Sequence, residues 1–335
     1  MKVTDFSRFL HKYLTSYLPK ERGCSQNTID TYRYTFIVFL EYLESIKIKT
    51  DRFEVKDFNY KLIISFLDYL ENDKKASIST RNNRLATILS FVRFLSFEYP
   101  DYLDKYNEIL EIPFKKTSIK SISHLDIEGL KLLMSSINRN SIKGYRDYMI
   151  IFILYETGVR VSELVNIKIK DFHFTKPYYL KVLGKGSKER IIPIAEDVIK
   201  ELKRYLERTV LDKEPVDSLL FTNRQDSSLT RMAINNILKK YADTARKSDS
   251  TLIPEKITPH IIRHSKAMHL LQSGVNIVYI RDFLGHSSIQ TTEIYARANS
   301  KAKQEAIESS YTDIYPSEKP KWQNKSTLEW LKRFN

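Results

Sequence analysis

Two arginines lie in short segments where they could stabilise negative charge on a phosphate. Arg160 belongs to the segment Thr157–Leu164, and Arg263 to His260–His264. A phosphodiester resists attack because its anionic oxygens repel nucleophiles, and charge grows further in the five-coordinate transition state. Guanidinium groups aimed at the non-bridging oxygens would stabilise that charge. Each arginine also has an ordinary explanation. Arg160 could form an ion pair with Glu163 on a helix, and Arg263 could be a surface arginine.

Histidines close to these arginines could move protons. His260 stands three residues before Arg263, so both would share one face of a helix. A neutral imidazole there could take a proton or steady a phosphate, or it could simply bond the helix start. His286 could donate to a phosphate oxygen, or it could be an ordinary loop histidine. His260 and His264 could together bind a metal, but no third ligand is evident, so neither metal nor cofactor is predicted.

Tyr295 and Lys185 are the candidates for nucleophile and general acid. Tyr295 is one of 21 tyrosines, so its count alone does not single it out. A phenol has a pKa of about 10, so attack requires nearby cations and a proton acceptor. Lys185 lies at the tip of a turn, Gly184-Lys185-Gly186-Ser187, where an ammonium group could protonate a departing oxygen. It could also be an exposed turn lysine, and Lys188 competes for the role.

Taken in order, these segments resemble the tyrosine recombinase (phage integrase) family. That family's pattern of Arg, hairpin Lys, His-x-x-Arg, His or Trp, then Tyr is complete between Thr157 and Ala296. The resemblance implies that Glu163 supports the first arginine and that His264 is a packing residue. It also implies that the catalytic residues are Arg160, Lys185, His260, Arg263, His286 and Tyr295.

The same resemblance implies a reaction. Tyr295 would attack a phosphate, form a 3′-phosphotyrosine and free a 5′ hydroxyl, and a partner strand would then reverse the step through a Holliday junction. The expected function is site-specific recombination, including that of a mobile element, on double-stranded DNA. The expected assembly is a homotetramer on two sites, with a dimer on each. Two alternatives are DNA relaxation by a type IB topoisomerase-like enzyme and a catalytically silent DNA-binding protein.

Composition agrees with a nucleic-acid partner without requiring one. The chain of 335 residues has 55 Lys and Arg against 41 Asp and Glu, giving a formal net charge of +14. Such an excess favours a polyanionic partner, although it can also reflect a solvated basic surface. Cys24 is the single cysteine, so no intrachain disulfide can form. The first residues do not resemble a signal peptide. We therefore expect a cytoplasmic, nucleoid-associated protein.

Hydrophobic periodicity divides the chain into four parts. They are a helical domain over residues 1–112, a basic linker over 113–123, a mixed domain over 124–310 and a tail over 311–335. The resemblance implies that the first domain is the core-binding domain and the second domain the catalytic domain. The pattern predicts a helix ending at Pro19. It also predicts two strands, Tyr179–Leu183 and Arg190–Ile194, that flank the turn carrying Lys185. The expected fold is mainly α, with an α+β catalytic domain that contains a small antiparallel sheet.

Polar residues in the first domain and the linker are candidate DNA contacts. Arginine and asparagine side chains suit phosphate and base-edge contacts, although such a cluster can also be an exposed helix start. The candidates at the start of the fourth helix and in the linker are Arg81, Asn82, Asn83, Arg84, Lys115 and Lys116.

The tail is a candidate docking segment. Its apolar residues Trp322, Leu328, Trp330 and Leu331 follow a polar, proline-containing stretch. A solitary helix of that length is marginal in water, so such a segment usually docks on a surface. We expect it to dock on a neighbouring protomer, or over its own active site before assembly. The alternative is a helix packed permanently on its own catalytic domain.

Overall fold

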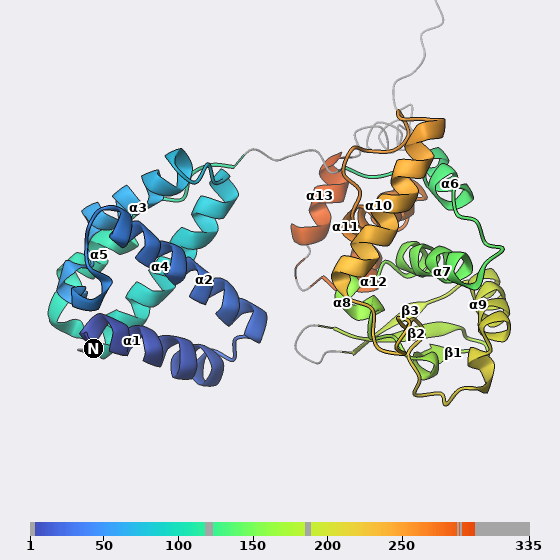
Figure 1. Cartoon of the computed structure of the whole chain (residues 1–335), viewed down its shortest axis with the longest axis horizontal. Helices are drawn as coiled ribbons and strands as arrows, with labels where there is room; N and C mark the ends of the chain where they lie inside the picture. Colours follow the sequence, from blue (N-terminus) through green and yellow to red (C-terminus); the bar gives the residue numbers. More distant parts are fainter. Residues whose placement is uncertain (1–3, 118–122, 185–188, 287, 289, 299–335) are drawn as a thin grey trace, which may run out of the picture. The chain divides into compact units, whose positions relative to one another are not determined.

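The computed structural model describes residues 4–117, 123–184, 189–286, 288 and 290–298 (Figure 1). They fall into two compact units, Met1–Lys120 and Ser121–Asn335, which are described separately below. In this part of the chain, every helix is too short or too polar to cross a lipid bilayer.

The N-terminal unit is a bundle of helices around an aromatic core. Its rings pack mostly edge to face, as for Phe39 and Phe66, whose centroids lie 5.2 Å apart at an interplanar angle of 88°. This geometry places the positive ring edge on the negative ring face. The α-helices are α1 (Asp5–Lys12), α2 (Gln26–Ser45), α3 (Tyr60–Asn72), α4 (Ile78–Glu98) and α5 (Leu103–Leu110).

The helix predicted to end at Pro19 continues past it. A π-helix over Tyr13–Glu21 follows α1 and contains Pro19. A proline lacks the N–H that an α-helix needs, and wider π-type turns can absorb this defect. Burial also favours continuation, because Tyr13 is completely buried and its hydroxyl lies 2.8 Å from the Ser90 Oγ. Tertiary packing therefore overrides the local stop signal.

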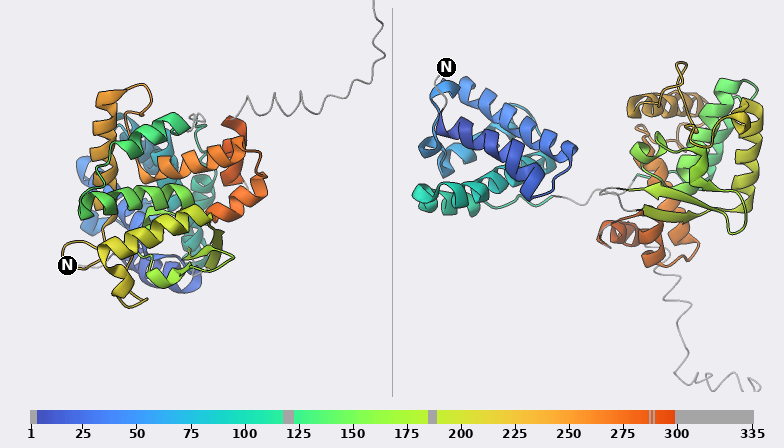
Figure 2. Two further views of the ribbon diagram at one scale, coloured as in Figure 1. Left: turned by 90° about the vertical axis from the view of Figure 1, so that its right-hand side faces the viewer. Right: turned by 90° about the horizontal axis from the view of Figure 1, so that it is seen from below.

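The C-terminal unit combines helices with one small sheet. Three antiparallel strands are ordered β1-β2-β3, and they lie along one side of the helices (Figure 2). Strand β3 faces β2 with Arg190 opposite Val182 and Ile192 opposite Leu180. The prediction of a mainly α fold with a small antiparallel sheet is confirmed. The strands are β1 (Phe172–His173), β2 (Tyr179–Leu183) and β3 (Glu189–Pro193).

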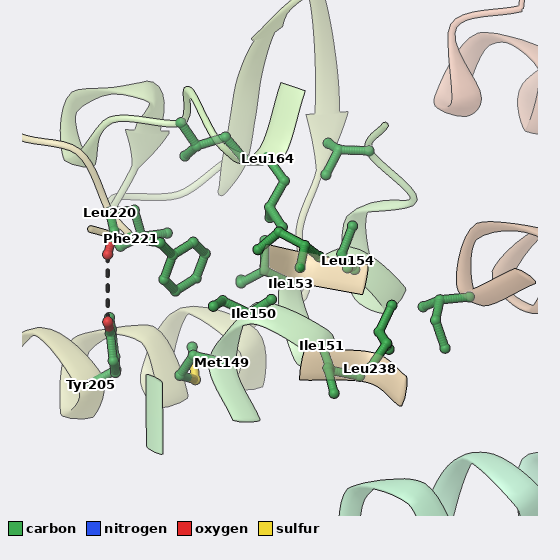
Figure 3. Packing of buried hydrophobic residues seen from close by; sticks show 14 of the residues in the cluster. Met149, Ile150, Ile151, Ile153, Leu154, Leu164, Tyr205, Leu220, Phe221 and Leu238 are labelled. Carbon is green, nitrogen blue, oxygen red and sulfur yellow. Dashed lines mark hydrogen bonds between the residues drawn. The ribbon is translucent and has the colours of Figure 1, made fainter. Parts of the chain in front are cut away.

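The core of this unit surrounds α7 (Figure 3). Met149, Ile150, Ile153 and Leu154 on this helix are all completely buried. Buried residues occur on most of its circumference, so neighbouring elements cover it on several sides. The helices of the unit are α6 (Ile127–Ser135), α7 (Ile142–Thr157), α8 (Val161–Leu164), α9 (Glu196–Thr209), α10 (Arg231–Ser248), α11 (Pro259–Gln272), α12 (Ile277–Leu284) and α13 (Gln290–Ala298).

Truncating the core of α7 should destabilise the C-terminal unit. Leu154→Ala leaves a cavity in a fully buried site, and such changes cost about 2–4 kcal/mol. Val216→Ala is the control, because Val216 is 62% exposed and its truncation should change stability by less than about 0.5 kcal/mol. Urea denaturation followed by circular dichroism measures both. Equal stabilities for the two variants would contradict the central place of α7.

Candidate active site

Arg160 is held at the start of α8 by a buried carboxylate. Its Nη1 donates to the Glu163 Oε1 at 2.9 Å, and its backbone N–H donates to the Glu163 Oε2 at 2.7 Å. The ion pair considered from the sequence is therefore present. About a third of the Arg160 side chain, 31%, is still exposed, whereas that of Glu163 is only 5% exposed. Glu163 thus supports a guanidinium that solvent or a ligand can still reach.

Arg190 shares the same carboxylate and was not predicted. Its Nη1 and Nη2 donate to the two oxygens of Glu163 at 2.9 and 2.7 Å. The sequence alone could not show it, because Arg190 is followed by both Ile191 and Ile192 and the buried face of the strand stays open. Residues two apart in a strand lie on the same face, so Arg190 faces inward with Ile192, which the structure shows to be buried. An inward-facing arginine requires a buried partner.

Hydrogen bonds from the two arginines keep Glu163 ionised. Burial alone would raise the pKa of Glu163, but bonds from Arg190 and Arg160 outweigh it and lower the pKa to about 2. Its charge is therefore present throughout the physiological pH range.

The turn after α12 brings a backbone carbonyl to Arg160. Gly285 ends α12 with φ +65°, a left-handed conformation that glycine adopts readily. Its carbonyl accepts a bond from the Arg160 Nη2 at 2.9 Å. A Cβ at this position would lie 2.8 Å from the Arg190 Cδ, so only glycine fits without displacing Arg190.

Arg263 is oriented by two backbone carbonyls from distant parts of the chain. It donates through Nη1 to the Gly158 carbonyl and through Nη2 to the Leu284 carbonyl, each at 2.6 Å. The residue is 4% exposed. Burial, together with the charge of Arg160, lowers the pKa of Arg263 to about 10, so the group is still charged at neutral pH. The carbonyl of Leu284 immediately precedes that of Gly285, so consecutive peptides orient Arg263 and Arg160.

Tyr295 is buried on α13 and bonded to His264. The residue is 1% exposed, and its hydroxyl lies 2.7 Å from the His264 Nδ1. His264 was assigned to packing on the family resemblance, so this bond to the candidate nucleophile was missed. Burial raises the pKa of Tyr295 to about 12, although Arg263 opposes the shift. Burial and the charges of His260 and Arg263 lower the pKa of His264 to about 4. The His264 imidazole is therefore neutral at physiological pH, and its Nδ1 can accept a hydrogen bond from the phenol.

The other two histidines are also held in the neutral form. The His286 Nδ1 lies 2.9 Å from the Thr292 Oγ1, and burial beside Arg263 and Arg160 lowers the pKa of His286 to about 4. His260 is accessible to solvent, yet its partial burial near the same arginines also lowers its pKa. The described residues contain no cluster of three or more potential metal ligands.

Some predicted site residues lie outside the described part of the chain. Lys185 and its competitor Lys188 are among them, as is the tail from 311 to 335. Within the described residues, the structure brings together five of the six predicted catalytic residues. They are Arg160, His260, Arg263, His286 and Tyr295. Glu163 connects Arg160 to Arg190 on β3.

Some of the predicted DNA contacts are bonded within the protein, and the others are not bonded to the linker. Arg81 is 5% exposed; it donates to the Pro113 carbonyl at 3.2 Å and pairs with Glu71 at 3.3 Å. Asn82 exchanges two bonds with the backbone of Lys115, whose ammonium also pairs with Glu71.

Arg81, Asn82 and Lys115 therefore anchor the start of the linker to the N-terminal unit. Arg81 could reach DNA only by leaving these partners. Asn83 and Lys116 are exposed, and the Arg84 guanidinium lies 5.5 Å from the centre of the Tyr34 ring.

Known families match both units of the chain. Residues 123–302 match the model of the phage integrase family, and residues 10–99 match the phage integrase N-terminal SAM-like domain. The chain belongs to the phage integrase family. As a tyrosine recombinase, it cleaves and rejoins DNA.

Individual relatives align with this recombinase over most of its length. It is 35% identical over 309 residues to the tyrosine recombinase XerD of Staphylococcus saprophyticus, covering 92% of this chain and 98% of that protein. A structure of the XerH site-specific recombinase bound to difH substrate before cleavage aligns with a TM-score of 0.65 at 25% identity, covering 88% of this chain and 83% of that one. A lambda integrase tetramer bound to a Holliday junction has the same fold, with a TM-score of 0.62 at 17% identity over 87% of this chain and 76% of that one.

Acid should destabilise the C-terminal unit of the recombinase through its buried histidines. The pKa values of His264 and His286 fall from an ordinary 6.5 to about 4 on folding. Between these values the unfolded chain binds more protons, so the free energy of unfolding decreases as the pH falls. Each histidine should remove on the order of 1–2 kcal/mol between about pH 7 and pH 5. Glu163 contributes only below its ordinary pKa of 4.5, because its folded pKa is about 2.

Thermal denaturation at pH 7 and pH 5 measures this effect. The variant His264→Gln/His286→Gln should lose less stability on acidification than the wild-type recombinase, whereas replacing the exposed His11 by Gln should leave the loss unchanged. An identical pH response in all three proteins would show that these imidazoles are not buried in the neutral form.

Proposed function

We propose that Tyr295 is the nucleophile and that Arg160 and Arg263 bind the scissile phosphate. One observation carries this assignment. Two oriented guanidinium groups lie in one site with a tyrosine whose hydroxyl is bonded to a neutral imidazole, and Arg263 is close enough to act on the pKa of that tyrosine. Both arginines keep N–H groups beyond those used for Glu163, Gly285, Gly158 and Leu284, because a guanidinium has five. Those N–H groups can donate to the non-bridging oxygens, where charge grows in the transition state.

The chemical step exchanges one phosphoester for another. The Tyr295 oxygen bonds to phosphorus, the bond from phosphorus to the 5′ oxygen breaks, and a 3′-phosphotyrosine and a 5′ hydroxyl result. The phenol proton goes to a neutral imidazole. We assign this role to His260, because the bond to His264 is broken when the hydroxyl reaches phosphorus. In the reverse step, a 5′ hydroxyl of the partner strand attacks the phosphotyrosine and releases Tyr295. The number of ester bonds is unchanged, so the exchange needs no external energy source.

His260 and His286 would assist at this centre. Their lowered pKa values keep them neutral, so each can donate one N–H and still accept a proton elsewhere. His286 is oriented by Thr292 and lies 6.5 Å from Tyr295 between ring centroids. We assign it to orienting the phosphate or the nucleophile, and His260 to proton transfer.

We infer that the substrate is double-stranded DNA that carries specific recombination sites. The XerH structure holds its own such substrate, difH. Asn83, Arg84 and Lys116 are the DNA contacts that we retain from the predicted set. The lambda integrase structure is a tetramer on a Holliday junction, and we infer a tetramer on two sites here, acting in the cytoplasm at the nucleoid. An assay with two sites distinguishes this from DNA relaxation by a monomer, which forms no junction.

Tyr295→Phe should abolish the covalent protein–DNA adduct. The change removes only the hydroxyl and its bond to His264, so folding and DNA binding should persist. A nicked suicide substrate, analysed on a denaturing gel, measures the adduct. Tyr279→Phe is a matched control, because Tyr279 on α12 is 70% exposed. An adduct from Tyr295→Phe at the wild-type rate would overturn the assignment.

Lys185 is the proposed general acid for the departing 5′ oxygen. Lys185→Ala should slow cleavage of ordinary DNA by roughly 10²–10⁴-fold, the usual contribution of such a group. Replacing the bridging 5′ oxygen by sulfur should restore most of the rate, because a thiolate leaves without a proton. Lys188→Ala serves as the comparison. Selective rescue of Lys188→Ala instead of Lys185→Ala would move the role to Lys188.

A further inference from the structure

Arg190 forms a two-bond ion pair with Glu163 at the site. The chemistry described above gives Arg190 no role. Arg190 stands on β3, and its two terminal nitrogens each donate to one oxygen of Glu163. This paired geometry fixes the direction as well as the distance between the two groups. The pair is buried, with side-chain exposures of 12% for Arg190 and 5% for Glu163.

Both groups that orient Arg160 contact Arg190. Glu163 accepts bonds from the backbone N–H and Nη1 of Arg160. The Gly285 carbonyl accepts the bond from the Arg160 Nη2, and Gly285 packs so tightly on Arg190 that even a methyl group would not fit. Removing Arg190 would therefore leave Glu163 free to turn and would open space beside Gly285. Either change would let the Arg160 guanidinium rotate.

The charges give a second consequence. Arg160, Arg190 and Arg263 surround a single carboxylate, Glu163, and the charge of Arg190 contributes to the lowered pKa values of Arg263 and His286. Arg190 therefore lies close enough to add positive potential where the phosphate is expected. A simple ion pair between β3 and α8 would explain the contact with Glu163, but not the packing on the residue whose carbonyl holds Arg160.

We propose that Arg190 is a positioning residue for DNA cleavage, which acts through Glu163 and Gly285 to aim the Arg160 guanidinium at the scissile phosphate. This rests on the phosphate-binding role proposed for Arg160. Arg190 touches neither Tyr295 nor, in this scheme, the DNA. A lysine at this position would keep the charge but could not form two parallel bonds to Glu163. Its shape is thus required as well as its charge.

The test compares two suicide substrates that differ at the scissile phosphate. One is the ordinary phosphodiester, and the other is a methylphosphonate, in which a neutral methyl group replaces one anionic oxygen. Stabilisation of phosphate charge matters less in the second. Arg190→Gln in the full chain should slow adduct formation on the phosphodiester by roughly 10–100-fold, less than the loss of a whole oxyanion donor. On the methylphosphonate, the rate of adduct formation by Arg190→Gln should lie within about threefold of the wild-type rate, because the orientation of Arg160 no longer limits the rate.

Three further variants separate the possible explanations. Arg190→Lys should behave like Arg190→Gln, and it replaces that variant in the test if the glutamine protein does not fold. Arg160→Gln should show the same selective rescue, and adding Arg190→Gln to it should cost little more, because both changes remove one function. Arg204→Gln is the matched control, since the Arg204 side chain on α9 is 69% exposed and pairs with Glu201.

The outcomes distinguish failure of the role proposed for Arg190 from failure of the phosphate-binding role proposed for Arg160. Equal losses on both substrates for Arg190→Gln, alongside rescue of Arg160→Gln, would show that Arg190 only supports the fold. Wild-type cleavage by Arg190→Gln or Arg190→Lys would overturn the inference too. Absence of rescue for Arg160→Gln itself would instead refute the phosphate-binding role of Arg160.

Discussion

The buried carboxylate of Glu163 is the interaction on which the geometry of the site depends. It joins the first turn of α8 to strand β3 through Arg160 and Arg190. Arg160 in turn bonds to the Gly285 carbonyl, and the adjacent Leu284 carbonyl bonds to Arg263. Segments from four places in the sequence are thereby fixed relative to one another. No hydrophobic contact could do this, because apolar packing does not specify direction.

Burying these charged groups lowers the stability of the fold, but it prepares the site to bind a phosphate. Removing an ion from water costs several kcal/mol, and a buried charge is tolerated only with a partner. Among the described residues, Glu163 pairs with Arg160 and Arg190 and also lies near the charge of Arg263, so positive charge remains in excess. That excess is what a phosphate would neutralise. It also contributes to the neutral state of the imidazoles, because burial and then the nearby positive charge lower the pKa values of His264 and His286.

Contiguous motifs were sufficient to select residues that the fold brings close together. Arg160, Arg263 and Tyr295 each stand in a short segment with characteristic neighbours, and the structure places all three in one site. Arg190 was missed because its partner lies 27 residues away, and only the burial of β3 reveals which way it points. The bond between His264 and Tyr295 spans 31 residues and depends on how α13 packs on α11. The anchoring of Lys115 by Asn82 likewise depends on how the linker, which follows α5, passes the start of α4. Local patterns carry no information about such pairings.

The burial of Tyr295 has a consequence for how its reactivity is controlled. If Tyr295 is the nucleophile, its hydroxyl must leave His264 to reach phosphorus, because a side chain that is 1% exposed cannot meet DNA where it lies. The ring packs in a small cluster with Ala267, Met268, Ile280 and Leu284. Exposing a large apolar side chain costs roughly 1.5–3 kcal/mol, and losing a neutral hydrogen bond costs about 1 kcal/mol.

The exposed form would then be roughly 0.1–1% of the population in the free protein. DNA can raise that fraction only by binding the exposed form more tightly. The site supplies a reason for such a preference. Arg263 already opposes the rise in the pKa of Tyr295 that burial causes. A hydroxyl that moves from the apolar cluster towards the guanidinium groups loses the burial that raises its pKa and gains the charges that lower it. If Tyr295 is the nucleophile, its release and its activation are therefore one movement.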